Sequence, residues 1–250
     1  PARDEAYHIP TVHESAVMAR RILHVSNIGT LISTFPGSSE SSLPRLTNDE
    51  EGENVQLHTA FERRPSDIAG SPIGLMEYYA DCEPHGPGNP TLLAIDIATP
   101  YRNHAAGSNL SLHVRWWPRQ TNTYLPSHSL LPSDNDENYD SEEIPTPHTP
   151  AALPRFNLHG RLEPISAADL LRHAVPACFM RAHPDSALWQ PGNDIHKSQY
   201  VRFVVEHVYW FGGFGDRARI GWLPIEEWRG VTMREIAEAR LPGEENEKMG

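Results

Sequence analysis

The residue types that most often carry chemistry are scattered along this 250-residue chain. Its 14 histidines form no HExxH pattern, so we predict that most lie at the surface or make hydrogen bonds, and that there is no metal site. The two cysteines, Cys82 and Cys178, lack the CxxC spacing of metal and redox sites, and the sequence leaves open whether they bond. No Ser-His-Asp or Cys-His arrangement is recognisable, so hydrolase chemistry is not expected.

Charge and hydropathy exclude several kinds of partner. The formal net charge of −12 disfavours nucleic acid and anionic membranes. No apolar run approaches the roughly 20 residues that span a bilayer, so no membrane span is expected. One glycosylation sequon is present, and it predicts Asn109 as the N-linked site, although the apolar strand that follows draws the segment inward. The start at Pro1, which a removed leader peptide would explain, adds the expectation of secretion or an endomembrane lumen.

The 23 prolines and 17 glycines indicate a loop-rich, strand-based protein. We predict a single domain over residues 1–250, with long surface loops at 38–67 and 118–154 and an acidic tail at 243–250. β-Branched and aromatic runs predict strands. These strands cover residues 28–35, 70–79, 92–97, 110–117, 156–162, 200–210 and 218–223. Helices are expected at residues 13–24, 100–108, 166–181 and 225–239.

The segment from Tyr200 to Trp222 is the most informative part of this pattern. An aromatic and β-branched strand leads into glycines 212, 213 and 215, and a second strand follows, which predicts a hairpin with a glycine corner. Strands come in runs rather than alternating with helices, and no GxGxxG opens a helix after a strand. The expected fold is therefore mainly β with peripheral helices, as a closed antiparallel barrel.

With these elements in place, the chain resembles the FMN-binding split-barrel superfamily of pyridoxamine 5'-phosphate oxidase. It is most similar to two branches, the CREG family of secreted glycoproteins and the HugZ-type proteins of haem utilisation. The likeness is carried by ARRILHVSNIGTLIS (19–33), by the Gly-Ser-Pro at 70–72, by ATPYRNHAAGSNLSLHVRW (98–116), and by RFNLHGRLEPI (155–165) with the helix and hairpin that follow it.

The resemblance implies a homodimer with FMN in a cleft between the subunits. The phosphate would be held near the end of the third strand, where Arg102 is the best candidate because a guanidinium binds phosphate oxygens bidentately. The flavin ring would lie near the aromatic residues of the partner subunit, in the region of residues 189–210. The implied cofactor-binding residues are Thr99, Tyr101, Arg102, Asn103, His104, Trp189 and Arg217, and the candidate haem ligands are His104, His159 and His207.

One departure from the oxidase pattern leads to two hypotheses for the function. The oxidases carry Ser-Arg-Lys where this chain has residues 98–100, Ala-Thr-Pro, and in this respect it is similar to the CREG branch, whose members lack the phosphate-binding set. The first hypothesis is therefore a non-catalytic, secreted, CREG-like homodimer with a vestigial flavin pocket, in which Arg102 makes a surface salt bridge. The alternative is an FMN-dependent oxidoreductase, or a haem-binding HugZ-like protein.

Overall fold

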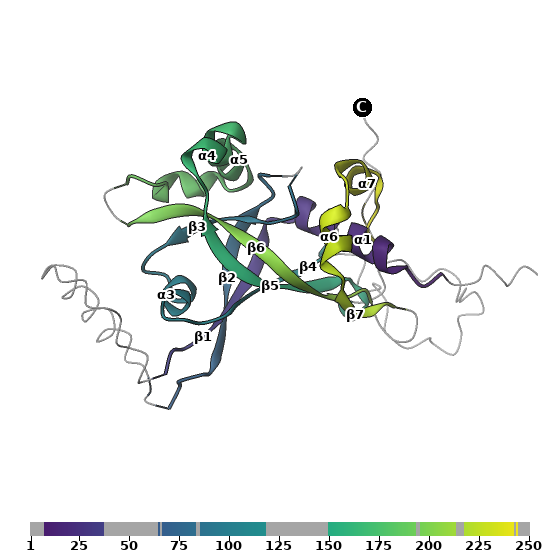
Figure 1. Cartoon of the computed structure of the whole chain (residues 1–250), viewed down its shortest axis with the longest axis horizontal. Coiled ribbons are helices and arrows are strands. Elements are labelled where there is room, and N and C mark those ends of the chain that lie inside the picture. The colour runs from purple at the N-terminus through teal and green to yellow at the C-terminus, as the bar shows by residue number, and fades with distance from the viewer. Residues whose placement is uncertain are drawn as a thin grey trace, which may run out of the picture.

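The computed structural model describes residues 8–37, 65, 67–83, 86–118, 150–193, 196–213, 218–242 and 244. The predicted long loops and acidic tail lie largely outside this part of the chain. The strands are β1 (Ile28–Thr34), β2 (Pro72–Ala80), β3 (Thr91–Ile95), β4 (Leu110–Arg115), β5 (Arg155–Pro164), β6 (Ser198–Phe211) and β7 (Ile220–Leu223) (Figure 1). The helices are α1 (Val12–Val25), α3 (Thr99–Ala105), α4 (Ala167–Arg172), α5 (Val175–Ala182), α6 (Ile225–Gly230) and α7 (Met233–Glu238), with short 3-10 turns η2 (Pro150–Ala152) and η3 (Pro184–Trp189).

The sheet closes into a barrel. Its strand order is β3-β2-β1-β4-β5-β6-β7, every pairing is antiparallel, and β3 also pairs with β6. Six strands therefore form the closed ring, and β7 extends the sheet from the far half of β6. All of the predicted strands are present, with ends that differ by at most two residues. The prediction of a mainly β split barrel with peripheral helices is confirmed.

The split lies along one edge of β6. That edge pairs with β3 through Ser198–Arg202 and with β7 through Val208–Phe211, so the stretch between them has no neighbouring strand. Side chains and a loop satisfy its backbone instead. The Val205 N–H donates to the side-chain oxygen of Asn89 at 2.9 Å, and Arg229 donates to the Val205 carbonyl at 3.2 Å. These polar contacts supply partners for the backbone of β6 between its two pairings, where buried groups without partners would cost free energy.

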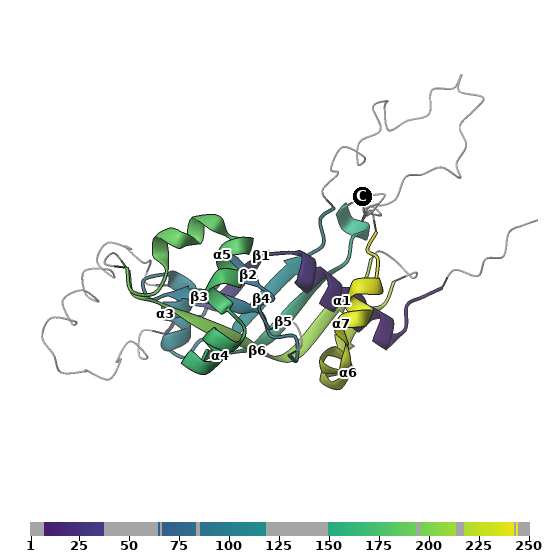
Figure 2. The same cartoon turned by 90° about the horizontal axis from the view of Figure 1, so that it is seen from above.

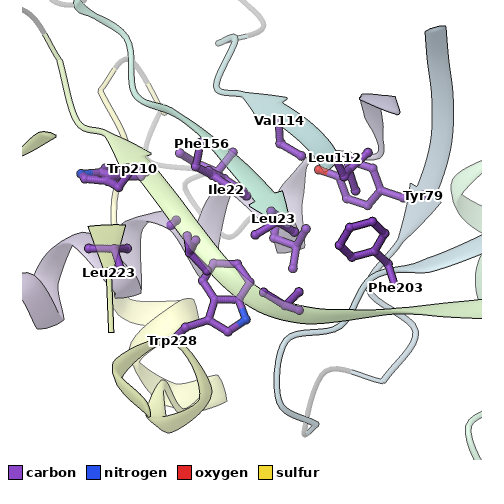
Figure 3. Packing of buried hydrophobic residues seen from close by; sticks show 14 of the residues in the cluster. Ile22, Leu23, Tyr79, Leu112, Val114, Phe156, Phe203, Trp210, Leu223 and Trp228 are labelled. Atoms are coloured by element: carbon purple, nitrogen blue, oxygen red, sulfur yellow. The ribbon is translucent and has the colours of Figure 1, made fainter. Parts of the chain in front are cut away.

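The main core lies inside the barrel and is completed by α1. Alternate residues of each strand point inward, and α1 adds a face that includes Ile22 and Leu23, both fully buried (Figure 3). Trp228 of α6 packs its ring against Phe156 with centroids 5.9 Å apart. In Figure 2 the helices form two groups, with α4 and α5 toward one end of the β-structure and α1, α6 and α7 toward the other.

Two of the predicted helices are interrupted. The segment 166–181 forms α4 and α5, because Ala174 takes a left-handed conformation with φ 46° and Pro176 starts a new helix. Ser166 caps α4 as predicted, accepting from the Asp169 N–H at 3.1 Å. The segment 225–239 likewise forms α6 and α7. Thr232 and Glu235 make a reciprocal capping box that begins α7, and this T-x-x-E signal was missed in the sequence.

The two cysteines form a disulfide. Cys82, just after β2, bonds Cys178 of α5 across a sequence separation of 96 residues. Both belong to a second, smaller apolar cluster between α5 and the barrel, in which Val175 and Phe179 are fully buried. The bond therefore attaches the α4–α5 region covalently to the end of β2. None of the helices in the described ranges has the length and apolar character needed to span a bilayer.

Candidate functional site

The candidate phosphate region is α3, which crosses from the end of β3 to the start of β4. It packs against β1 and β2. Its first turn has no side-chain cap, because the residue before it is Ala98, and Pro100 restricts the backbone there. The helix carries five of the predicted cofactor residues, so the directions of their side chains decide what this region can bind.

Three of those side chains are engaged within the fold. Asn103 is 1% exposed and donates from its amide to the Ser33 hydroxyl of β1 at 3.0 Å. Tyr101 is 8% exposed and belongs to the main core. The Nδ1 of His104 lies 3.0 Å from the carbonyl oxygen of Ser108, so this ring bridges the end of α3 to the loop before β4. These contacts attach α3 to the barrel.

An acidic group that sequence reasoning missed lies beside this helix. Glu77 of β2 faces the same side of the sheet as the core residue Leu31, because it pairs with Gly29. Burial raises the pKa of the Glu77 carboxyl to about 7, although the Tyr101 hydroxyl and the Tyr78 N–H both favour the carboxylate. Burial also raises the pKa of Tyr101, and Glu77 adds to this shift. A carboxyl group therefore borders the region predicted to receive a phosphate.

The remaining predicted cofactor residues are distributed around this end of the barrel. Thr99 and Arg102 of α3 are half-buried, and Arg102 makes an interaction within the fold. Trp189 closes η3 and packs on the disulfide cluster. Its carbonyl accepts from Ser198, which pairs with Ile95 four residues before α3. Thr99 and Trp189 therefore flank the same end of the β3–β6 pair. Arg217 lies outside the described residues.

A polar hollow of about 440 Å³ lies where β1, β2 and α3 end. Gly70, Gly107 and Ser108 contribute to its wall, and Asn109 lines it as an exposed residue. The Ser108 hydroxyl accepts from the Thr34 N–H at 2.8 Å, which fixes this corner. The expectation that the following strand draws the sequon inward applies only from Leu110 onward, because Leu110 is buried and Asn109 is not. The sequon asparagine is thus accessible to solvent.

The outer surface of the sheet carries two rows of side chains that cross neighbouring strands in register. We call these eleven residues the outer face. Following the pairings from β2 to β7, the first row is Met76, Thr30, His113, Asn157, Tyr209 and Trp222, and the second is Gly74, Ile32, Ser111, His159 and His207. Neither row contains an acidic residue, although the chain as a whole is strongly acidic. The first row is exposed to solvent at both ends, since Met76 is 63% exposed and Trp222 is 62% exposed.

The three candidate haem ligands are therefore not brought together. His104 lies on α3, whereas His159 and His207 face each other on the outer face. Within the described ranges, no three His, Cys, Asp or Glu side chains gather as a metal-binding group.

Comparison with known proteins decides the family. A family model described as CREG, beta-barrel matches residues 46–229, which is more than half of the chain. The chain belongs to the CREG β-barrel family. The resemblance that the sequence motifs carried is thus confirmed. A comparison with curated proteins finds no match.

Solved structures share the fold at low sequence identity. A haem-binding protein from Mycobacterium smegmatis is 19% identical with a TM-score of 0.50, over 90% of this chain and 62% of that one. A protein of unknown function from Agrobacterium tumefaciens is 16% identical (TM-score 0.44, 93% and 64% coverage), and an FAD-binding protein from Mesorhizobium loti is 14% identical (TM-score 0.37, 77% and 91%). This chain spans less than two thirds of the length of the first two. At these identities the likeness bears on the fold alone.

Proposed function

We propose that this CREG-family chain acts through its protein surface, as a homodimer in an oxidising compartment, and that its flavin region is vestigial. The observation that carries the proposal is the use of α3. Asn103 is bonded to Ser33, Tyr101 is in the core and His104 is bonded to Ser108. Three of the five α3 side chains predicted to bind the cofactor therefore hold the helix against the barrel instead.

The charge around α3 supports the same conclusion. A dianionic phosphate out of bulk water needs cationic partners. Arg102 is the arginine of the helix and already makes an interaction within the fold, and the Glu77 carboxyl beside Tyr101 is an opposing group. An ionised Glu77 would repel a phosphate placed beside it, and protonating Glu77 to remove that repulsion costs free energy above its pKa.

The disulfide supports secretion or an endomembrane lumen. Structural disulfides persist mainly in oxidising compartments, and the Cys82–Cys178 bond leaves no free cysteine in the chain. The exposed Asn109 offers an N-linked glycosylation site in the same setting.

The outer face supports self-association. Two copies that each carry a formal charge of −12 repel, so a contact between them must use an uncharged surface. The outer face is such a surface, with Met76 and Trp222 as large apolar side chains at its two ends. A twofold contact would pair this face with itself.

The cofactor test is the visible spectrum of the purified protein, followed by titration with FMN monitored by flavin fluorescence. We expect a colourless protein and no quenching. A flavin band, or FMN binding that Arg102→Ala weakens by about 10- to 100-fold, would establish the flavin-dependent alternative instead. A haem Soret band would establish the haem alternative. Arg172→Ala is the matched control, because Arg172 is 72% exposed on α4.

The assembly test is light scattering coupled to size-exclusion chromatography, with an expected mass of twice 28.0 kDa. Met76→Asp places a carboxylate on the outer face and should weaken the dimer about tenfold or more, because a buried unpaired charge costs at least about 2 kcal/mol. Leu171→Asp is the matched control, since Leu171 is an exposed apolar residue of α4, away from this face. A monomer at micromolar concentration, or equal effects of both variants, would contradict the proposed dimer.

A further inference from the structure

Two histidines of the outer face differ from most others in the described part of the chain. His159 of β5 and His207 of β6 are directly opposite each other in the antiparallel register. Neither makes a hydrogen bond or ion pair to any described residue, and their only ring contacts are with Trp222. Six other histidines have a hydrogen-bond partner within 3.1 Å of a ring nitrogen, which is a carboxylate, an amide or a carbonyl, and one of them, His13, has two. These six are His8, His13, His24, His104, His113 and His183.

The register places the two imidazoles side by side on one face of the sheet. Directly opposed residues of an antiparallel pair have Cβ atoms about 4.5–5.5 Å apart and point to the same face. The ring centroids of His159 and His207 lie 5.5 and 6.3 Å from that of Trp222, so both rings border the same indole. The chain changes register just beyond this pair, between His159 and Gly160. Such a bulge locally twists the strand and can aim a side chain.

The protonation state of His159 suits a metal ligand. Burial, and the neighbouring His207, lower the pKa of His159, so its neutral form is favoured near pH 7. A neutral imidazole has one ring nitrogen with a free lone pair, and this nitrogen is what binds a metal ion. Arg161 and Glu206, on the same two strands, form an ion pair at 3.2 Å in which neither histidine takes part.

We propose that His159 and His207 chelate a divalent late transition-metal ion, Cu²⁺, Ni²⁺ or Zn²⁺, each through one ring nitrogen. Imidazole suits these borderline ions, whereas Ca²⁺ and Mg²⁺ prefer oxygen ligands. Since the described residues provide no third protein ligand, water fills the remaining positions. The expected order of affinity places Cu²⁺ above Ni²⁺ and Zn²⁺.

The proposed site needs one chain only and does not rest on the proposed dimer. In that dimer, however, the pair would lie in the contact between the two copies, and metal binding would then be linked to the association of the chains. The mass of the metal-loaded protein therefore reports on the dimer separately from the metal affinity.

The test titrates the purified, EDTA-treated protein with CuCl₂ while following tryptophan fluorescence and, in parallel, the heat of binding. Cu²⁺ bound next to Trp222 should quench part of the emission, and excess Zn²⁺ should reverse the quenching by competition. His159→Gln and His207→Gln should each weaken Cu²⁺ binding about tenfold or more. Trp222→Phe should remove the quenching and leave the calorimetric affinity unchanged.

His173→Gln is the matched control, because His173 is a part-exposed histidine at the end of α4 and is not one of the outer-face residues. It should bind Cu²⁺ like the parent protein. Unchanged affinity in both outer-face variants, or an equal loss in the control, would overturn the proposal. Binding of haem that depends on the same two histidines, without binding of free Cu²⁺, would also overturn it.

Discussion

Removing the Cys82–Cys178 disulfide tests both the stability of the fold and the compartment that we infer. The bond closes a loop with a sequence separation of 96 residues. In the chain-entropy model, opening a loop of this length returns about 4.7 kcal/mol of conformational free energy to the unfolded chain at 25 °C. Structure retained in the unfolded state reduces this value, so we expect the Cys82→Ala/Cys178→Ala variant to lose about 2–5 kcal/mol.

The assay is urea unfolding at equilibrium, followed by tryptophan fluorescence, on the parent protein, the double variant and the parent with reductant. The double variant and the reduced parent should have similar, lower midpoints. In thermal unfolding the same loss lowers Tm by about 4–20 °C for a chain of this size. Cys178→Ala alone, which leaves Cys82 as a free thiol, controls for the loss of the bond without truncation of the buried residue.

Equal stability of the oxidised parent and the double variant would refute this reasoning. It would mean either that the thiols do not bond or that the α4–α5 region adds nothing to the cooperative unit. Mass spectrometry after alkylation of the unreduced, unfolded protein separates the two cases. Addition of two alkyl groups shows free thiols and removes the support for an oxidising compartment.

Two further predictions concern packing and pH. Gly160→Ala should destabilise the fold by about 1–3 kcal/mol or more in urea unfolding, because its new Cβ would lie 2.0 Å from the Val204 carbonyl oxygen, whereas Gly230→Ala meets nothing and should be neutral. The hydrogen bonds that His13 donates to the carboxylates of Glu235 and Glu227 raise its pKa above the ordinary value near 6.5. The stabilising effect of His13 should therefore be complete below about pH 6.5 and lost as pH rises through the raised pKa. The stability difference between the parent and His13→Asn should therefore be larger at about pH 6 than at about pH 8.5, and an equal difference at both would contradict the assignment.

The strands could be predicted because their signal is local. In β4 and β5, apolar and polar residues alternate, and every inward position of Leu110–Val114 is buried in the structure. The helix breaks were harder to predict. Nothing in the sequence at Ala174 requires a left-handed conformation, which is rare for alanine.

The site residues could not be sorted from the sequence, because their roles depend on register. Apart from Pro100, the residues from Thr99 to His104 are all polar or aromatic and all suit a ligand, yet Asn103 donates to Ser33 and is buried. In the same way, His159 and His207 are 48 positions apart in the chain, and only the β5–β6 register makes them neighbours. The alternation of side chains along a strand predicts on which face of the sheet each histidine lies, but not that the two histidines are neighbours.

The contrast between α3 and the outer face indicates where binding energy is available in this molecule. On α3, a ligand would have to break contacts such as Asn103–Ser33, and leaving a buried amide unpaired costs about 1–3 kcal/mol for each group. On the outer face, the ring nitrogens of His159 and His207 make no hydrogen bond to a described residue that a ligand would have to break, and Trp222 is 62% exposed. A partner or ion that binds there gains its interactions without disrupting the fold. For this reason we expect substitutions on the outer face to change association or metal binding at nearly constant stability, and substitutions of Asn103 to change stability first.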